Sequence, residues 1–252
     1  MSSVFFVNKR KWHTCSWLVA ILLLVLGCST NENKLSDAAY FPLKVGSTWI
    51  YDVEENTISR ASCTDDGVTI SKYELRVVVA DSFPNTENGF TYRINRSKRL
   101  KSTDEWTELD TWTSKLNGNK FVSNESNINF VKLVIPISDN VAWNGNQFNN
   151  KLELNGLNED EYKATLVGQP YTNSSTLTFS KTISVVQNDQ QKNLLYRDSR
   201  LEIYAFGVGL VYKESYLLNY FDKAELPCYG TNKTQKGTIY KQSLKEFIPK
   251  IK

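Results

Sequence analysis

Long stretches of the chain alternate apolar and polar side chains with a period of two. The clearest case is the segment 176–185, where leucine, phenylalanine, isoleucine and valine alternate with threonine and serine. Similar alternation occurs at 72–79, 90–95 and 130–137. Successive side chains of a β-strand point to opposite faces, so this pattern is typical of strands with one buried and one wet face. The chain is therefore predicted to be all-β.

Short clusters of turn-forming residues separate these segments. They include Asp-Asp-Gly at 65–67, Asn-Gly-Asn at 117–119 and Asn-Gly at 155–156. Asn-Gly pairs suit the positive φ angles of tight hairpins, and strands joined by short hairpins pair with their neighbours. We expect a single antiparallel meander that curls into a barrel or half-barrel rather than a sandwich, because a curled sheet hides its edges best.

One short helix is predicted near the C-terminus, at 241–247. Leu244, Phe247 and Ile248 would share one side of it. Such a helix could cover a barrel mouth or a sheet edge.

A basic and then apolar segment lies near the start of the chain. Three basic residues at 9–11 precede the apolar run 17–26, which ends in Gly27 and Cys28. This layout is typical of a secretory signal. A bilayer span needs roughly twenty apolar residues, about twice the length of this run, so we expect the segment to be removed rather than to stay as a transmembrane helix.

The chain is accordingly expected to have three parts. Residues 1–27 are predicted to be a signal peptide, and 28–38 a flexible, lipid-anchored tether, because residues 29–38 are polar and nearly free of aromatic side chains. Residues 39–252 are predicted to form a single β-rich domain, a length that suits one large β-fold.

The sequence Val-Leu-Gly-Cys at 25–28 resembles a bacterial lipobox. In that class of signals the cysteine receives lipid on its sulfur and becomes the new N-terminus. The resemblance implies lipid attachment at Cys28, with the membrane as a partner through the N-terminal lipid.

Cleavage before Cys28 limits the chemistry of the remaining chain. The only histidine, His13, leaves with the signal, which excludes a Ser-His-Asp triad and a histidine-ligated zinc. Three basic residues leave and no acidic one, since the first is Glu32, so the net charge of +3 falls by three to about zero. We therefore expect no enzyme activity, catalytic residue, metal or cofactor, and no nucleic-acid partner, which would need a basic face.

Two cysteines, Cys63 and Cys228, remain besides the lipidated one. An exported chain meets an oxidising compartment, where disulfides form and persist. We hypothesise that the two residues pair, and the alternative is two separately buried thiols.

The segment 104–112 holds the most suggestive candidates for ligand chemistry. If it is one regular strand, Trp106, Glu108, Asp110 and Trp112 point the same way, with neighbours roughly 6.5 to 7 Å apart. Carboxylates at that separation could serve glycoside hydrolysis, and the indoles could stack on sugar rings. The simpler interpretation is two tryptophans packing at the ends of a strand whose middle faces water.

Other motifs are more simply explained as structural. The acidic clusters 65–67 and 158–161 lack the ligand spacing of an EF-hand calcium loop and are interpreted as solvated turns. The Gly-Val-Gly at 207–209 is not followed by the Gly-Lys-Ser/Thr of a phosphate loop. Its glycines suit a bulge or a sharp bend.

Three stretches together resemble a family of Bacteroidota envelope lipoproteins of unknown function. They are an aromatic-Pro-Leu-x-Val-Gly-x-x-Trp-x-Tyr start at 41–51, Trp-Asn-Gly-Asn at 143–146, and a Gly-Val-Gly-Leu-Val-Tyr strand at 207–212. The family as known has no established chemistry. The resemblance therefore implies an envelope location and adds no catalytic residue.

Two hypotheses of function follow. The first is a lipid-anchored, non-enzymatic envelope protein that binds a protein or an apolar ligand such as a lipid, since tyrosines recur through the strands and suit pocket mouths and interfaces. The second is a glycan-binding or carbohydrate-active lipoprotein that uses 106–112. The outer membrane, facing the periplasm, is the expected location, and exposure on the cell surface is the alternative.

Overall fold

The computed structural model describes residues 37–191 and 193–250, and nearly all of its regular structure is β-strand. These residues belong to one compact unit, Asp37–Lys252. The predicted signal peptide 1–27, the predicted lipid site Cys28 and the predicted tether up to residue 36 lie outside the described residues. The last two residues of the predicted tether take part in the fold: Ala38 begins a 3-10 turn, and Asp37 Oδ2 accepts the N–H of Ile137 at 2.7 Å.

Twelve strands follow the short 3-10 turn η1 (Ala38–Tyr40). They are β1 (Thr48–Ser59), β2 (Val68–Pro84), β3 (Phe90–Arg99), β4 (Thr107–Asn117), β5 (Lys120–Glu125), β6 (Ile128–Val134), β7 (Ala142–Asn144), β8 (Glu161–Thr172), β9 (Thr178–Gln190), β10 (Tyr196–Ala205), β11 (Gly209–Tyr220) and β12 (Thr234–Ile248). Within the described residues no helix is long and apolar enough to cross a bilayer.

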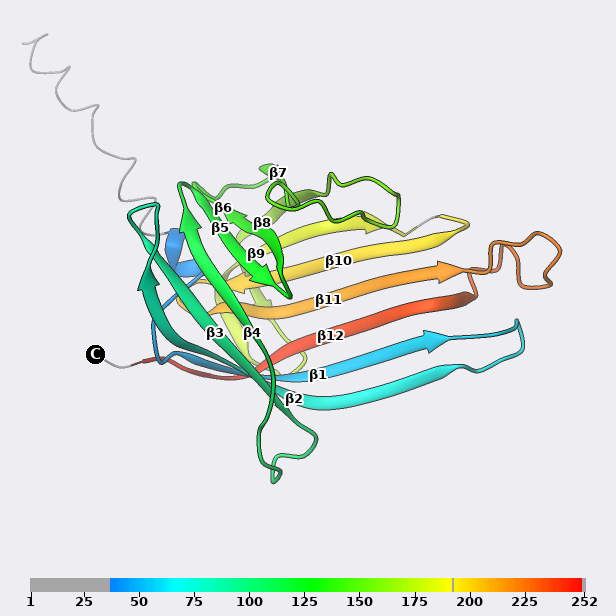
Figure 1. Cartoon of the computed structure of the whole chain (residues 1–252), viewed down its shortest axis with the longest axis horizontal. Coiled ribbons are helices and arrows are strands. Elements are labelled where there is room, and N and C mark those ends of the chain that lie inside the picture. The colour runs from blue at the N-terminus through cyan, green and yellow to red at the C-terminus, as the bar shows by residue number, and fades with distance from the viewer. Residues whose placement is uncertain (1–36, 192, 251–252) are drawn as a thin grey trace, which may run out of the picture. The chain divides into compact units, whose positions relative to one another are not determined.

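The strands form one antiparallel sheet in the order β6-β5-β4-β3-β2-β1-β12-β11-β10-β9-β8-β7 (Figure 1). Consecutive strands pair with each other except β6 and β7, which are the two outer strands, and β1 pairs with β12. The two outer strands also meet, because Val131 N of β6 donates to the carbonyl of Gly145 at 2.9 Å and Trp143 Nε1 of β7 donates to the carbonyl of Val131 at 2.8 Å. The sheet is thus a nearly closed barrel, which confirms the predicted all-β meander and the preference for a barrel over a sandwich.

The predicted helix at 241–247 is wrong, because these residues belong to β12. A bulge at Lys245 explains the error: Leu244 pairs with Tyr51, whereas the next paired residue of β12, Glu246, pairs with Ile50. The extra residue places Leu244 and Phe247, three positions apart, on the same side of the strand. That spacing imitates the helical period, while hydrogen bonding to β1 and β11 on both sides holds the segment extended.

Apolar side chains fill the barrel in two main clusters. The first is built around Tyr40, Leu133, Tyr162, Ile183 and Tyr204, and the second around Trp49, Tyr51, Leu75, Val79 and Leu244. The turn η1 supplies Tyr40, and the next residue, Phe41, stacks on Phe121 with ring centroids 5.0 Å apart. The segment that enters the barrel from the N-terminal side is therefore part of the core at that end.

The β8–β9 hairpin covers part of the outer face. Asn173 Nδ2, at its tip, donates to the carbonyl of Leu244 on β12 at 2.7 Å, although β10 and β11 lie between β9 and β12 in the sheet. Tyr171 packs on Tyr212 of β11 with ring centroids 5.9 Å apart. Apolar residues are consequently buried on both faces of the sheet in this region.

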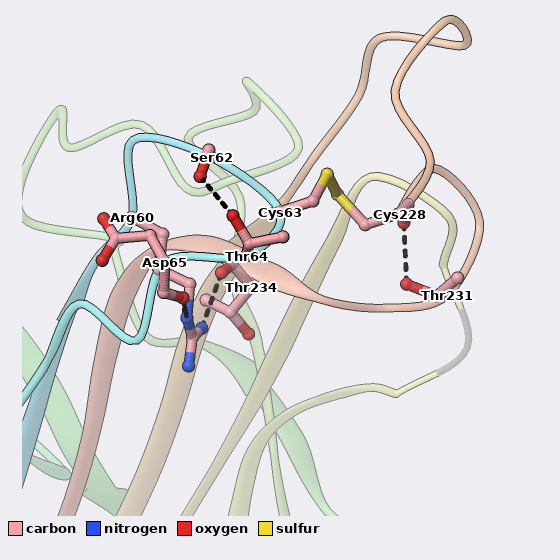
Figure 2. Close-up of a disulfide and its surroundings, with 8 residues drawn as sticks. All are labelled: Arg60, Ser62, Cys63, Thr64, Asp65, Cys228, Thr231 and Thr234. Carbon is pink, nitrogen blue, oxygen red and sulfur yellow. Dashed lines mark hydrogen bonds between the residues drawn. A yellow bond between two sulfur atoms is a disulfide. The ribbon is translucent and has the colours of Figure 1, made fainter.

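A disulfide joins two loops at one end of the barrel (Figure 2). Cys63 lies in the β1–β2 loop and Cys228 in the β11–β12 loop, with their Cα atoms 5.7 Å apart and 165 positions apart in sequence. Arg60 crosses between the same loops, donating to the carbonyls of Asp65 at 3.1 Å and Thr234 at 2.7 Å. The predicted Cys63–Cys228 pairing is confirmed.

Candidate functional site

The inward face of β10 carries a row of polar side chains. Asp198, Arg200, Glu202 and Tyr204 alternate along the strand, and each is at least nine-tenths buried. The register places Glu202 opposite Lys213 of β11, so both point into the barrel.

A cavity lies inside the barrel beside this row. Its volume is about 120 Å³, and it is partly open to solvent. One part of its wall is apolar and is formed by Phe41, Leu43, Val77, Val79 and Leu210. The other part is charged and is formed by Arg96, Glu125, Lys132, Glu202 and Lys213. A concave site with an apolar wall and a few polar groups is the usual form of a small-molecule pocket.

The charged groups of the wall pair with one another. Lys132 Nζ lies 2.7 Å from Glu202 Oε1 and 3.1 Å from Glu125 Oε1. Lys213 Nζ lies 3.1 Å from the same Glu202 oxygen, and the Tyr204 hydroxyl donates to the other one at 2.5 Å. Glu202 therefore accepts hydrogen bonds from Lys132 and Tyr204 and forms an ion pair with Lys213, in a region almost closed to water.

Burial and pairing act in opposite directions on these groups. Burial raises the pKa of the Glu202 carboxyl, but the ammonium groups of Lys132 and Lys213 outweigh it and hold the pKa well below its ordinary value. Burial likewise lowers the pKa of Lys132, while Glu125 and Glu202 raise it by more, so its pKa lies above the ordinary value. Glu202 and Lys132 are thus both ionised at neutral pH.

A second pair lies at the more exposed side of the cavity. Arg96 Nη1 bonds both carboxylate oxygens of Asp110, at 2.8 and 3.0 Å, and Trp112 Nε1 donates to Asp110 Oδ2 at 3.0 Å. The Arg96 guanidinium lies over the Trp112 ring, 3.8 Å from its centroid. Side chains of Asp110 and Lys213 remain 31% and 23% exposed, against 1% for Glu202, so solvent reaches the cavity on the charged side.

Arg200 holds a separate buried cluster. Its guanidinium makes a two-bond contact with Asp160, at 2.7 and 3.0 Å, and bonds Asp198 Oδ1 at 2.6 Å. A third carboxylate, that of Glu153, has its Oε2 atom 3.3 Å from Nη2 of Arg200. Because Glu153 and Asp160 belong to the segment between β7 and β8, one guanidinium ties that segment to β10.

We expect acid to destabilise the protein by about 2 kcal/mol between pH 7 and pH 3. Burial raises the pKa of Glu153, but hydrogen bonds and the charges of Lys151 and Arg200 outweigh it, so both Glu153 and Glu202 have a pKa below the ordinary 4.5. The unfolded chain therefore binds protons first as the pH falls below about 4.5, and stability is lost from there down to the folded pKa values. Asp160, whose pKa burial raises, opposes part of this loss.

Urea titrations at each pH measure this dependence. Glu202→Gln is the control, because it removes one titrating carboxylate and should flatten the curve below pH 4.5. A stability that is unchanged down to pH 3 in the unaltered protein would show that the carboxylates are not held ionised by their partners.

The four candidate residues of 106–112 do not share one face. Glu108 pairs with Ser97 and Asp110 with Arg96, and because Ser97 and Arg96 are consecutive, their side chains lie on opposite faces. A bulge at Leu109 causes the change of face, since it adds one residue between the two carboxylates. The expectation that Trp106, Glu108, Asp110 and Trp112 point the same way is therefore wrong.

The two tryptophans consequently have different surroundings. Trp112 lines the cavity beside Arg96, and both side chains bond Asp110, which is not part of the lining. Trp106 precedes β4 and lies between two outward-facing guanidiniums, Arg76 at 4.6 Å and Arg99 at 4.3 Å from its ring centroid. Of the predicted set only Trp112 lines the cavity, and Asp110 contacts it through the Trp112 indole and Arg96.

The alternation pattern of the sequence did not reveal the charged residues of the cavity wall. Glu202 and Lys213 stand in segments where apolar residues occupy the alternate positions, such as Leu201 and Ile203 next to Glu202. Those apolar residues face outward and are buried beneath the β8–β9 hairpin. Because both faces are covered, the alternation does not tell which face is the interior.

A second hollow lies on the outer face of β1, β2 and β12. Its floor carries exposed ion pairs such as Lys72–Glu54, whose side chains are 71% and 43% exposed. Pairs of this kind are well solvated and contribute under about 1 kcal/mol. The interior cavity is the stronger candidate site.

Two solved structures resemble this fold. One, from Bacteroides fragilis, is described as an exported protein with a YmcC-like fold, and it matches with 12% identity over 82% of this chain and 98% of its own, at a TM-score of 0.39. The other, from Parabacteroides distasonis, is described as a lipoprotein, with 10% identity over 83% of this chain and 98% of its own, at a TM-score of 0.37. At these scores neither structure identifies a ligand, an activity or a family for this chain. No protein-family model and no curated protein matches it.

Proposed function

We propose that the protein is a lipid-anchored envelope protein that binds an amphipathic small molecule inside its barrel. The observation that carries the proposal is the divided wall of the cavity. An apolar chain would lie against Phe41, Leu43 and Val77, and a polar group would face Arg96 and Lys213 on the side that solvent reaches. A protein partner, which is the competing hypothesis, would need no such interior space.

Binding without catalysis fits the state of the charged groups. Lys132, Glu202 and Lys213 are ion-paired with one another, and Arg96 is paired with Asp110, so none is left as an unpaired acid or base. General acid–base catalysis needs a group poised near the working pH, whereas pairing holds Glu202 ionised. We therefore assign these groups to recognition.

The proposed location follows from the N-terminal segment. Lipid attachment at Cys28 would leave nine residues, Cys28 included, before Asp37. An extended chain spans at most about 3.5 Å a residue, so the barrel would stay within roughly 30 Å of its anchor. Placement in the outer membrane, facing the periplasm, would keep the cavity close to a source of amphipathic molecules.

A cavity-filling variant tests the proposal. Val77 lines the cavity, so Val77→Phe should fill its apolar part and weaken binding of a fluorescent fatty-acid probe at least about tenfold. Val78→Phe is the matched control, because the next residue of β2 points to the other face and should leave affinity unchanged. Probe fluorescence titrations give both dissociation constants.

Two results would contradict the proposal. One is equal affinity of the two variants for the probe, which would place binding outside the barrel. The other is an absence of both probe binding and co-purifying lipid in organic extracts of the unaltered protein. Either result would favour an interaction module for another protein.

A further inference from the structure

One end of the barrel exposes a group of large apolar side chains, which we call the η1 rim. Its members are Val45 (39% exposed), Phe83 (47%), Phe90 (53%), Phe206 (41%) and Ile248 (46%). Among the described residues four phenylalanines are this exposed, and three of them belong to the rim. Exposed aromatic rings gathered at one site mark a surface for interaction.

Hydrogen bonds and pairing place these residues at the same end. Gly207 N, beside Phe206, donates to the carbonyl of Ala39 in η1 at 2.9 Å. Gly46 N, beside Val45, donates to the carbonyl of Val79 at 2.8 Å, and β2 continues from there to the hairpin tip that holds Phe83 and Phe90. Ile248 pairs with Thr48 at the start of β1. In Figure 1, η1 and the end of β12 lie at the end opposite the β11–β12 loop.

The charges of the rim suit an anionic surface. Lys44, Lys181 and Lys250 are exposed, and none of the three makes an ion pair with a carboxylate in the described part of the chain. The Lys181 ammonium lies 4.5 Å from the centroid of the Phe206 ring. The acidic residues of the β2–β3 hairpin are neutralised by partners, Asp81 by Arg93 at 2.8 Å and Glu87 by Lys115 at 2.7 Å.

The N-terminal segment leaves the described structure at this end. Asp37 precedes η1 directly, and eight residues, 29–36, lie between it and Cys28. A lipid on Cys28 would therefore lie within roughly 30 Å of the point where the chain enters the η1 end of the barrel, even if the segment were fully extended.

We infer that the η1 rim rests on the bilayer that holds the N-terminal lipid. The phenylalanine rings would enter the headgroup region, and the lysines would keep their ammonium groups at the level of the phosphates, as is usual for interfacial surfaces. The inference depends on the proposed anchoring at Cys28. It adds an orientation: the disulfide end points away from the membrane.

Site-specific labels on the lipidated protein test this orientation. A single environment-sensitive fluorophore on Phe206→Cys, in vesicles of phosphatidylethanolamine and phosphatidylglycerol, should shift its emission to the blue and be quenched by nitroxide lipids. The matched control is Leu195→Cys, which is similarly exposed at 51% but lies at the disulfide end. Its label should be quenched by aqueous iodide and unaffected by nitroxide lipids.

A variant with Phe83, Phe90 and Phe206 all changed to serine measures the strength of the contact. Each half-exposed ring should strengthen docking about fivefold. The ratio of docked to undocked barrels should therefore fall roughly a hundredfold in this variant. The label for this variant is placed on Val45→Cys, and far-UV circular dichroism confirms that the barrel is retained.

The outcomes distinguish the proposed anchoring at Cys28 from the proposed docking of the η1 rim. Mass spectrometry that finds no lipid on Cys28 contradicts the anchoring. A lipidated protein whose labels at 206 and 195 are equally open to iodide contradicts the docking alone. A label at 206 that leaves water only when an envelope protein is added would assign the rim to a protein partner and also overturn the inference.

Discussion

Replacing Arg200 by methionine is expected to lower the free energy of unfolding by about 4 kcal/mol at pH 7. The guanidinium is the shared partner of Asp160, Asp198 and Glu153, whose side chains are at most 3% exposed. Methionine has a similar length but no charge, so the variant would leave buried carboxylates without their main cation. A buried charge without a partner costs several kcal/mol, because the lost hydration is no longer offset.

Urea unfolding of the two proteins at pH 7 measures the effect. Arg93→Met is the control, since Arg93 and Asp81 pair on the surface with side chains 50% and 48% exposed, and its loss should stay under about 1 kcal/mol. Lowering the pH should reduce the deficit of the Arg200 variant. Asp160 already has a pKa raised by burial, and without Arg200 it would take up a proton at a still higher pH.

The direction of the pH effect distinguishes loss of the cation that pairs with the buried carboxylates from simple loss of packing. A cavity left by a shorter or more flexible side chain would cost the same at every pH. If the deficit of the Arg200 variant is the same at pH 5 and pH 7, or is below 1 kcal/mol at pH 7, the carboxylates are not buried charges that depend on this guanidinium.

Removing the disulfide with the double change Cys63→Ala and Cys228→Ala is expected to cost up to about 5 kcal/mol. The crosslink closes a loop of 165 residues, and the chain-entropy model assigns a stabilisation of that size to so long a loop. The effect acts mainly on the unfolded chain, which becomes free to expand. The denaturant dependence of the unfolding free energy should therefore increase along with the loss of stability.

Two measurements check this prediction. Urea unfolding of the double variant and of the reduced, unaltered protein should give the same midpoint, well below that of the oxidised protein. Thiol labelling of the unfolded but unreduced protein should find no reactive thiol at Cys63 or Cys228. An oxidised protein no more stable than the double variant would show that the two loops are already held by other contacts, such as those of Arg60.

Several errors of prediction have one physical cause, the β-bulge. A bulge at Lys245 gives β12 an apolar spacing that imitates a helix, and a bulge at Leu109 turns Glu108 and Asp110 to opposite faces. A bulge adds a single residue to one strand, so it shifts every later side chain to the other face. The extra residue is set by pairing with a distant strand, and local alternation does not reveal it.

The sequence alone determined the class of the fold and the crosslink. Alternation with a period of two and short turns rich in Asn and Gly require paired strands, because no other regular structure buries every second side chain. Once Cys15 and Cys28 are assigned to the proposed signal peptide and lipid site, two cysteines are left, and their predicted pairing is the Cys63–Cys228 disulfide that the structure contains.

Only the tertiary structure decided where the site lies. Closure of the sheet turns one face of each strand inward, and it brings Lys132, Glu202 and Lys213 together from β6, β10 and β11. Closure also gathers the η1 rim from four separate segments at one end. These groups are far apart in sequence, and a period of two is unchanged when the two faces are exchanged. The choice of face depends on which strands close the barrel and on what covers its outside.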